Sequence, residues 1–255
     1  MTGRRRPTAV VTGASGGIGS AIARRLAADG HRVVVGYHRS VERADELVAS
    51  LAGDGHRAAR ISVLEPDSLA ALADDLRAEV GRLEVLVNCA GVTRPVAHDD
   101  LDGLDDELIG EIFATNWRGP FAAIRALRPL LEEPSAQGDP AAVVVNISSI
   151  AGVTGQGSNV AYCASKAALD SMTRSLGRAL APSIRMVSVS PGWVLGEYAD
   201  RMPPGALDVQ TQATPLGRLA TPDDVAAAVS AAVHTLTFTT GAVIGVDGGR
   251  ILGTS

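Results

Sequence analysis

Aromatic residues are scarce in this sequence, and it contains no long apolar run. Phenylalanine, tyrosine and tryptophan make up only 3% of the 255 residues, so aliphatic side chains must fill any core. With 46% hydrophobic residues, the chain can bury a substantial core and is most simply a single domain, residues 1–255. No stretch of about 18 consecutive apolar residues occurs, so we expect no membrane-spanning helix and no membrane partner.

Cysteine is also rare. The two cysteines, Cys89 and Cys163, show neither the spacing of a metal site nor the number that a disulfide framework needs. A reducing, cytoplasmic location fits this pattern. The five histidines are scattered, so we expect no metal site; they are His31, His38, His56, His98 and His234.

An excess of positive charge is absent as well. Lysine and arginine number 23 against 28 acidic residues, which gives a net charge of −5 and no electrostatic footprint for nucleic acid. Three arginines at positions 4–6 resemble the start of an export signal, but glycines from Gly13 onward interrupt the apolar segment that follows. We expect residues 1–7 to form a flexible, solvated tail.

Short aliphatic runs alternate with helical stretches along the chain. The expected strands are 8–12, 31–37, 57–63, 84–87, 143–147, 185–190 and 242–246. The expected helices are 20–29, 41–52, 66–80, 105–133, 162–181 and 222–234. This alternation predicts an α/β fold of the Rossmann type, doubly wound, with a seven-stranded, mostly parallel sheet and helices on both faces. Ligands of such sheets bind at the carboxyl ends of the strands.

A glycine-rich turn joins the first expected strand to the first helix. Glycines let the backbone approach a pyrophosphate, and the helix N-terminus supplies free amides and partial positive charge. The alternative is a tight turn without a ligand. The expected dinucleotide contacts in this turn are Gly13, Ser15, Gly16, Gly17, Ile18 and Gly19. After the fourth strand, Asn88, Ala90 and Gly91 are expected beside the same ligand.

Tyr162 and Lys166 lie four positions apart on an expected helix, which places them on one face. A phenol titrates near about 10, and a neighbouring ammonium lowers that pKa by favouring the phenolate. Tyr162 could then exchange a proton with a substrate oxygen, which Ser149 at a strand end could also bind. Alone, the pair is more often a packed ring and a solvated amine.

Together these residues resemble the short-chain dehydrogenase/reductase family over nearly the whole chain. The matching segments are Thr12-Gly13-x-x-x-Gly17-Ile18-Gly19, Asn88-x-Ala90-Gly91, Asn116, Asn146-Ile147-Ser148-Ser149, Tyr162-x-x-x-Lys166, Pro191-Gly192 and Asp247-Gly248-Gly249. Each segment alone is weak, but all of them in this order are specific. The subgroup that the chain most resembles comprises reductases of 3-oxoacyl thioesters on acyl carrier protein and related ketoreductases.

The resemblance implies hydride transfer between a nicotinamide cofactor and a carbonyl or alcohol carbon. Tyr162 would be the general acid, and Lys166 would lower its pKa and bind the nicotinamide ribose. Ser149 would orient the substrate oxygen, and Asn116 would anchor a water that leads protons to Lys166. Ser148 is the rival of Ser149, which is preferred because the family's serine precedes the tyrosine by thirteen positions.

The end of the second strand bears on the choice between NADP(H) and NAD(H). NAD enzymes place a carboxylate there, whereas this chain has Tyr37, His38, Arg39 and Ser40, which favours NADP. Gly16 argues the other way, because many NADP members of the family carry arginine at that position. NAD(H) therefore stays open.

Two departures from the family pattern affect the remaining cofactor contacts. Ser62 and Val63 stand where an aspartate usually binds adenine, and Gly196 replaces a threonine that usually binds the nicotinamide carboxamide. The expected contacts near the nicotinamide are therefore Tyr162, Lys166, Pro191, Gly192 and the backbone of Val194.

Residues 193–219 show no strong period and are expected to form a substrate lid. Five apolar residues of this segment could line an apolar substrate pocket or could simply pack in the core or at an interface, and the sequence favours neither alternative. They are Trp193, Tyr198, Met202, Leu207 and Val209.

The resemblance implies a small carbonyl or alcohol substrate, and it implies a homotetramer. An acyl carrier protein stays open as a partner, because the ends of the long helices lack basic residues. The favoured function is an NADP-dependent ketone reductase. The alternatives are an NAD-dependent dehydrogenase of alcohols, hydroxysteroids or sugars, and a non-catalytic nucleotide-binding scaffold.

Overall fold

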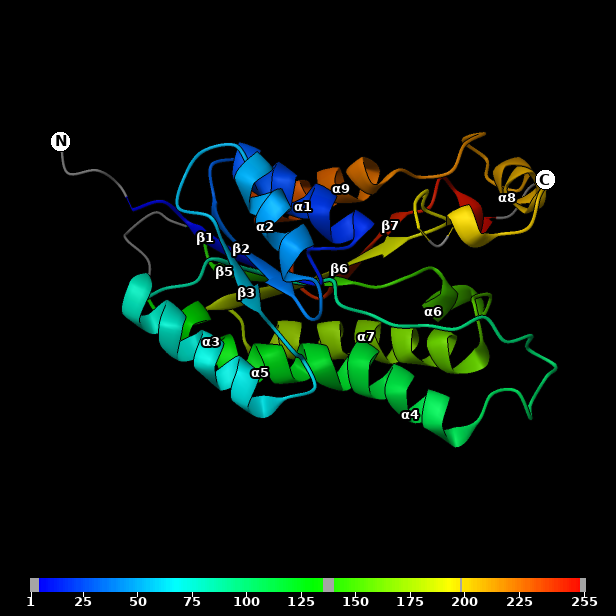
Figure 1. Ribbon diagram of the computed structural model, residues 1–255, viewed down its shortest axis with the longest axis horizontal. Coiled ribbons are helices and arrows are strands. Elements are labelled where there is room, and N and C mark those ends of the chain that lie inside the picture. Colours follow the sequence, from blue (N-terminus) through cyan, green and yellow to red (C-terminus); the bar gives the residue numbers. More distant parts are fainter. Residues whose placement is uncertain (1–4, 135–139, 198, 253–255) are drawn as a thin grey trace.

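Seven parallel strands form the centre of the molecule (Figure 1). The computed structural model describes residues 5–134, 140–197 and 199–252. The strands are β1 Thr8–Thr12, β2 Arg32–Tyr37, β3 Arg57–Arg60, β4 Val85–Asn88, β5 Ala142–Ile147, β6 Ile184–Pro191 and β7 Ala242–Val246. They lie in the order β3-β2-β1-β4-β5-β6-β7, and every neighbouring pair is parallel. The predicted doubly wound α/β fold is confirmed.

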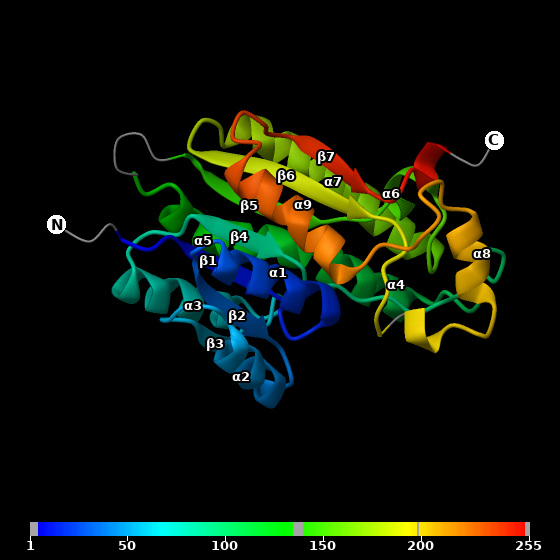
Figure 2. The same ribbon diagram turned by 90° about the horizontal axis from the view of Figure 1, so that it is seen from above.

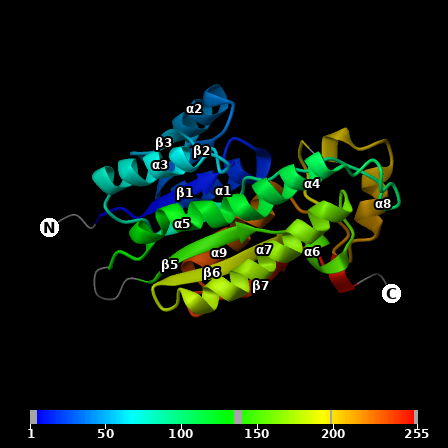
Figure 3. The same cartoon turned by 90° about the horizontal axis from the view of Figure 1, so that it is seen from below.

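Helices cover both faces of the sheet. They are α1 Gly17–Ala28, α2 Val41–Ser50, α3 Pro66–Glu79, α4 Asp106–Phe113, α5 Gly119–Leu131, α6 Ala151–Thr154, α7 Val160–Ala179, α8 Ala206–Gln212 and α9 Pro222–His234. A π-helical turn, η1 Ala114–Arg118, joins α4 to α5, and the short 3₁₀ segments are η2 Ala199–Arg201 and η3 Arg250–Leu252. Helices α1, α2 and α9 lie on one face (Figure 2), and α3, α5 and α7 lie on the other (Figure 3).

The strands are aliphatic because both of their faces are covered. Every residue of β1, β5 and β6 is buried, as expected for inner strands of a parallel sheet. Successive side chains alternate between two cores. In β1, Val11 packs in the core beneath α1 and α9, whereas Val10 packs in the core beneath α3, α5 and α7.

The strand order reverses at β1, which lies between β2 and β4. In a doubly wound sheet, the connections leave the strands on opposite sides of such a point, so a crevice opens at their carboxyl ends. This arrangement places the glycine turn after β1 beside the segment that follows β4.

Several boundaries differ from the sequence-based expectations. Helix α7 begins at Val160 rather than at Tyr162, because the Asn159 side chain caps it by accepting a hydrogen bond from the Tyr162 amide at 2.7 Å. Strand β3 ends at Arg60 rather than at residue 63, since the Ser62 amide turns to donate to Ser68 Oγ at 3.0 Å. The short helices α6 and α8 were not expected.

Two arginines of the expected flexible tail make ion pairs. Arg5 pairs with Glu84, and Arg6 Nη1 lies 2.9 Å from Asp54 Oδ1. Both arginine side chains stay partly exposed in these pairs, and the flexible tail over residues 1–7 remains a prediction. No helix in the part of the chain that the structure describes has the length and hydropathy to cross a bilayer.

Candidate active site

The turn between β1 and α1 requires glycine at two positions. Gly13 has φ +65°, and a Cβ there would lie 2.9 Å from Ala90 Cα in the segment after β4. A Cβ at Gly19 would lie 2.3 Å from Gly13 O. Gly16 occupies the N-cap of α1 and offers no side chain to bind the first amides of the helix. Those amides therefore face the crevice, in the arrangement that suits a phosphate group.

Thr12 ties this turn to the end of β4. Its Oγ1 accepts hydrogen bonds from the amides of Cys89 at 3.1 Å and Ala90 at 3.2 Å. Asn88 points instead into the sheet, where its Nδ2 donates to Asn146 Oδ1 at 2.9 Å. The Asn88 side chain thus links β4 to β5 beneath the crevice.

Lys166 is almost completely buried at the carboxyl end of β5. Its Nζ donates to Ile147 O at 2.8 Å and lies 5.6 Å from the centre of the Tyr162 ring. Burial lowers the pKa of the ammonium from 10.5 to about 8. Lys166 is also the only lysine in the sequence, beside 22 arginines. The structure therefore brings the predicted cation and phenol together.

Asn116 lies within the π-helical turn η1 and faces the same point. Its Oδ1 accepts from the Val92 amide at 2.8 Å, and its Nδ2 donates to Val92 O at 3.0 Å and to Ser165 Oγ at 3.2 Å. A Cβ on Gly91 would lie 3.3 Å from Asn116 Oδ1 and 3.9 Å from Lys166 Nζ. Asn116 and Lys166 thus flank Gly91.

The two serines after β5 have different surroundings. Ser148 is buried, and its Oγ donates to Lys166 O at 3.4 Å. Ser149 is only partly buried, and its Oγ accepts from the Ala151 amide at 3.2 Å, which leaves the hydroxyl proton available to another acceptor. The geometry favours Ser149 over Ser148 for binding a ligand oxygen.

Asn159 is a site residue that the sequence reasoning missed. Besides capping α7, its Nδ2 donates to Arg94 O at 2.8 Å, so it joins the start of the Tyr162 helix to the segment after β4. An asparagine directly before a helical stretch is an N-cap signal that could have revealed it.

The residues predicted to contact the adenosine part of the cofactor lie at the carboxyl ends of β2 and β3. Tyr37 pairs with Arg60 across the two strands, and His38 and Arg39 are exposed. Ser40 caps α2 by accepting from the Arg43 amide at 3.4 Å. Ser62 and Val63 are buried beside them.

Arg60 and Glu65 were not predicted as parts of this region. The Arg60 guanidinium donates to both carboxylate oxygens of Glu65 at 3.0 Å, and these hydrogen bonds lower the pKa of Glu65. The two arginines of this short strand, Arg57 and Arg60, were the available signal.

The start of the expected lid is fixed to its end. Val194 forms a parallel β-bridge with Ala220, in which the Leu195 amide donates to Ala220 O at 2.8 Å and the Ala220 amide donates to Trp193 O at 3.0 Å. These bonds use the groups on either side of Val194, so its own N–H and C=O point to the other edge of the segment. Pro191 and Gly192 precede the bridge, and the Gly192 amide donates to Val246 O at 3.0 Å.

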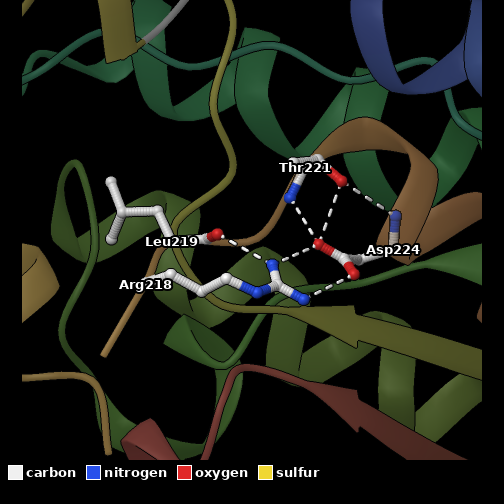
Figure 4. Close-up of polar contacts among 4 residues, drawn as sticks. All are labelled: Arg218, Leu219, Thr221 and Asp224. Carbon is white, nitrogen blue, oxygen red and sulfur yellow. Dashed lines mark hydrogen bonds and ion pairs between the residues drawn. The ribbon is translucent and has the colours of Figure 1, made fainter. Parts of the chain in front are cut away.

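The end of the lid is anchored to the first turn of α9 (Figure 4). Arg218 binds both carboxylate oxygens of Asp224, at 2.6 and 2.9 Å. Asp224 also accepts from the Thr221 amide at 2.7 Å, while its own amide donates to Thr221 Oγ1 at 3.2 Å. This is a capping box, and the Arg218 hydrogen bonds hold the pKa of Asp224 well below its usual value.

The lid residues expected to line a substrate wall are distributed unevenly. Trp193, Met202 and Leu207 are partly buried, Val209 is 60% exposed, and Tyr198 lies outside the described residues. Helix α8 is held by the C-terminal segment, because Arg250 donates to Gln210 O at 2.8 Å and to Gln210 Oε1 at 2.6 Å. Arg43 of α2 reaches Glu197 of the lid at 3.3 Å.

A cavity of about 400 Å³ opens between the segment after β4 and helix α4. Val92, Thr93 and Leu108 contribute to its wall. Its charged lining comprises Arg94, Asp105, Glu107 and Glu111. Since Val92 binds Asn116 and Arg94 binds Asn159, this cavity adjoins the Tyr162 site and has a negative balance of charge.

Comparisons with known proteins agree with this geometry. A family model described as enoyl-(acyl carrier protein) reductase matches residues 13–250. The chain is 40% identical over 249 residues to "Granaticin polyketide synthase putative ketoacyl reductase 2" of Streptomyces violaceoruber, covering 96% of each chain. It is also 40% identical over 251 residues to cis-4-hydroxycyclohexanecarboxylate dehydrogenase of Sinomonas cyclohexanicum, covering 94% of this chain and 95% of that protein.

A solved structure extends the comparison to three dimensions. The 3-ketoacyl-(acyl-carrier-protein) reductase of Brucella melitensis, determined in complex with NADH, superimposes with a TM-score of 0.85 at 28% identity. The match covers 96% of this chain and 98% of that one. The glycine turn, the Tyr162–Lys166 pair and these full-length similarities lead to one conclusion: the chain belongs to the short-chain dehydrogenase/reductase family of oxidoreductases.

Proposed function

We propose that this protein uses NADPH to reduce a ketone to an alcohol, with Tyr162 as the proton donor. The observation that carries the proposal is the buried Lys166 ammonium, which is fixed by Ile147 O at 2.8 Å and lies beside the Tyr162 ring. Burying a lysine is costly, and such a group is expected where its charge is needed for chemistry.

The residues at the crevice fit a dinucleotide. A Cβ at Gly13 or Gly19 would clash with backbone atoms, so both positions keep the turn tightly closed against the end of β4. The uncapped amides at the start of α1 would bind the pyrophosphate. Val194 directs its backbone groups away from Ala220, where they would bind the nicotinamide carboxamide.

In this proposal each side chain has one task around the substrate oxygen. The nicotinamide, when bound, supplies hydride to the carbonyl carbon. Tyr162 donates its hydroxyl proton to the oxygen, and Ser149 donates a hydrogen bond to the same atom. Lys166 binds the ribose and stabilises the phenolate left on Tyr162. Asn116 holds a water that returns a proton towards Lys166.

Replacing Tyr162 by phenylalanine tests this role. Tyr162→Phe removes the proton donor but keeps the ring, so turnover of ketones with NADPH should fall about 10²–10⁴-fold. NADPH binding, followed by its fluorescence, should stay close to that of the wild-type protein. Ser149→Ala and Ser148→Ala form a matched pair, in which only the first should lower turnover strongly. Wild-type turnover in Tyr162→Phe would refute the mechanism.

The preference for NADPH is proposed from the charge at the end of β2. No carboxylate follows Tyr37 there, and His38 and Arg39 are exposed and can meet a 2′-phosphate. Arg39→Ala should raise the KM for NADPH about tenfold, because one phosphate ion pair is lost, and should leave the KM for NADH unchanged. Arg77→Ala on α3 is the control. Equal effects on both cofactors would count against a 2′-phosphate site.

We propose a 3-oxoacyl thioester or a similar ketone as the substrate. The ketoacyl reductase relative supports this class. The carboxylates of Asp105, Glu107 and Glu111 around the neighbouring cavity would repel an acidic carrier protein. Comparing turnover of one 3-oxoacyl group as a simple thioester and on a carrier protein separates the two forms, and we expect the simple thioester to be used at least as well.

An NAD-dependent alcohol dehydrogenase is the second candidate. The similarity to a dehydrogenase of a cyclic hydroxy acid favours it, as does the carboxylate of Glu65 near the end of β3. Assaying a panel of ketones with NADPH and of alcohols with NAD⁺ distinguishes the two directions. Cofactor binding without turnover of any member would instead indicate a non-catalytic scaffold.

We also propose a homotetramer in which the α4–α5 face contacts a second copy (Figure 3). Trp117 and Phe121 stack on this face with ring centres 6.2 Å apart, and each is 37% exposed. The exposed residues before them, Glu107 and Glu111, are acidic, and Arg125 beyond them is basic. An antiparallel pair of such faces would bring opposite charges together.

A further inference from the structure

Asp170 is a buried carboxylate to which the proposed mechanism gives no task. It lies on α7 and is only 3% exposed. Its Oδ1 is buried and has no hydrogen-bond partner among the residues that the structure describes. An isolated buried carboxylate is strongly destabilising unless a positive charge lies near it.

Lys166 supplies that positive charge. It precedes Asp170 by four residues on α7, a spacing that places the two side chains on one face of the helix, one turn apart. Both side chains are buried, so solvent screens their attraction little. Arg174, one turn further along, is exposed, where solvent screens its charge.

The sheet beneath α7 carries a second buried polar group without a hydrogen-bond partner among the described residues, Ser190. Helix α7 runs antiparallel to the strands, because Lys166 binds Ile147 O at the end of β5 while Thr173 binds Ser188 of β6 at 2.8 Å. Ser190 lies on the same face of β6 as Ser188, two residues nearer the carboxyl end of the strand. Its Oγ is also buried without a hydrogen-bond partner among the described residues.

The other groups around Lys166 carry no charge at neutral pH. From the segment after β4 comes the Cys89 thiol, whose burial raises its pKa to about 12. From β5 comes the carbonyl of Ile147, from η1 the amide of Asn116, and from α6 the backbone of Gly152. Tyr162 is the phenol whose ionised form Lys166 stabilises in the proposed mechanism.

We propose that Asp170 is a positioning residue of the active site, whose buried carboxylate keeps the single lysine charged from the side opposite Tyr162. Asp170 would thus join Asn116, Ser149, Tyr162 and Lys166 as a residue that the reaction needs. Unlike those residues, it would act through Lys166 and would not touch substrate or cofactor. The proposal rests on the proposed function for its consequence in turnover, but the charge of Lys166 can be measured without any turnover.

The presence of one lysine makes that measurement direct. Protein labelled with ¹³C,¹⁵N-lysine gives a single side-chain signal, and its shift with pH reports the protonation of Lys166. The wild-type midpoint is expected near 8, since burial lowers the pKa of Lys166 to that range. Asp170→Asn has nearly the same shape but no charge, and should lower the midpoint by about one pH unit. Ser171→Ala, at an exposed neighbouring position, should leave it unchanged.

A midpoint in Asp170→Asn equal to that of the wild type would overturn the proposal. An equal displacement by Ser171→Ala would overturn it too, because the effect would then come from disturbance of the helix. Asp170→Ser is a second uncharged variant in case Asp170→Asn does not fold, and its midpoint must move in the same direction.

The pH dependence of ketone reduction provides a second, independent test. In ketone reduction the alkaline limb of the pH profile, where Lys166 loses its proton, should move to lower pH in Asp170→Asn by the displacement seen in the spectra, while the KM for ketone changes little. An unmoved limb in a protein whose lysine midpoint has moved would show that the charge does not govern turnover, and would overturn the positioning role. If the wild-type protein reduces no ketone, the proposed function fails while the spectroscopic result still decides whether Asp170 charges Lys166.

Discussion

His31 illustrates what burial does to a single titratable side chain. It precedes β2, is 2% exposed, and lies with its ring centre 5.1 Å from that of His234 on α9. Burial, and secondarily the charge of His234, lowers the pKa of His31 from 6.5 to about 4. Its Nδ1 has no hydrogen-bond partner among the described residues. The backbone of Leu26 and the charge of Asp29 favour a proton on this ring, but burial outweighs them.

This burial predicts acid sensitivity. Between pH 6.5 and about 4 the unfolded chain binds a proton at His31 that the folded chain does not, so the free energy of unfolding falls as the pH falls through that window. The loss should be on the order of 3 kcal/mol at the acid end. In His31→Gln this part of the slope should vanish, whereas His98→Gln, at an exposed position, should keep it. Urea denaturation at several pH values measures the difference, and parallel slopes in all three proteins would contradict it.

Other single residues show which parts of the site could be predicted from the sequence. Tyr162, Lys166 and Asn116 were predictable because a motif fixes their spacing, and the structure gathers them around Gly91 and the end of β5. Asp170 was not, because its significance comes from burial and from the lack of other charges near Lys166. Only the packed structure reveals those two properties.

At the scale of elements, the strands were predictable and the short helices were not. Runs such as Val143–Ile147 are β-branched and buried on both faces, so local preference and tertiary environment agree. Helix α8 has no buried residue and depends on Arg250, which binds Gln210 from 40 residues further along the chain. The π-helical turn η1 likewise follows from the position that Asn116 takes beside Val92. Such long-range contacts leave no local pattern in the sequence.

Removing the capping box at the start of α9 should have a measurable effect on the stability of the protein. Asp224→Ala removes the acceptor for the Thr221 amide and the partner of Arg218, so the free energy of unfolding should fall by about 1–2 kcal/mol. Because the expected lid, residues 193–219, ends just before this point, the KM for substrate should rise as well. Asp223→Ala, at the neighbouring position without these contacts, is the control. Chemical denaturation and steady-state kinetics test both parts, and equal stability of the two variants would argue against the anchor.

At the scale of the whole molecule, the two faces of the sheet have different tasks. The face with α1 and α9 supports the glycine turn, while the face with α5 and α7 carries Asn116, Tyr162 and Lys166 (Figures 2 and 3). The crevice between β1 and β4 is where both sets meet. The proposed assembly through α4 and α5 would therefore brace the face that carries Tyr162 and Lys166.

Charge placed on the aromatic pair should dissociate the proposed tetramer. Phe121→Asp would bury a carboxylate at the contact and remove the stacking partner of Trp117, so the assembly mass measured by light scattering should fall. Ala49→Asp, an exposed position of α2 on the other face of the sheet, should leave the mass unchanged. A wild-type protein that is already monomeric, or a Phe121→Asp protein of undiminished mass, would exclude this interface.

The solitary lysine has a practical consequence for handling the protein. Amine-reactive esters usually modify exposed lysine side chains. The one lysine of this chain, Lys166, is only 6% exposed, and its amino group is hydrogen-bonded within the crevice. Labelling chemistry that depends on exposed lysine side chains would therefore leave this ε-amino group largely unmodified.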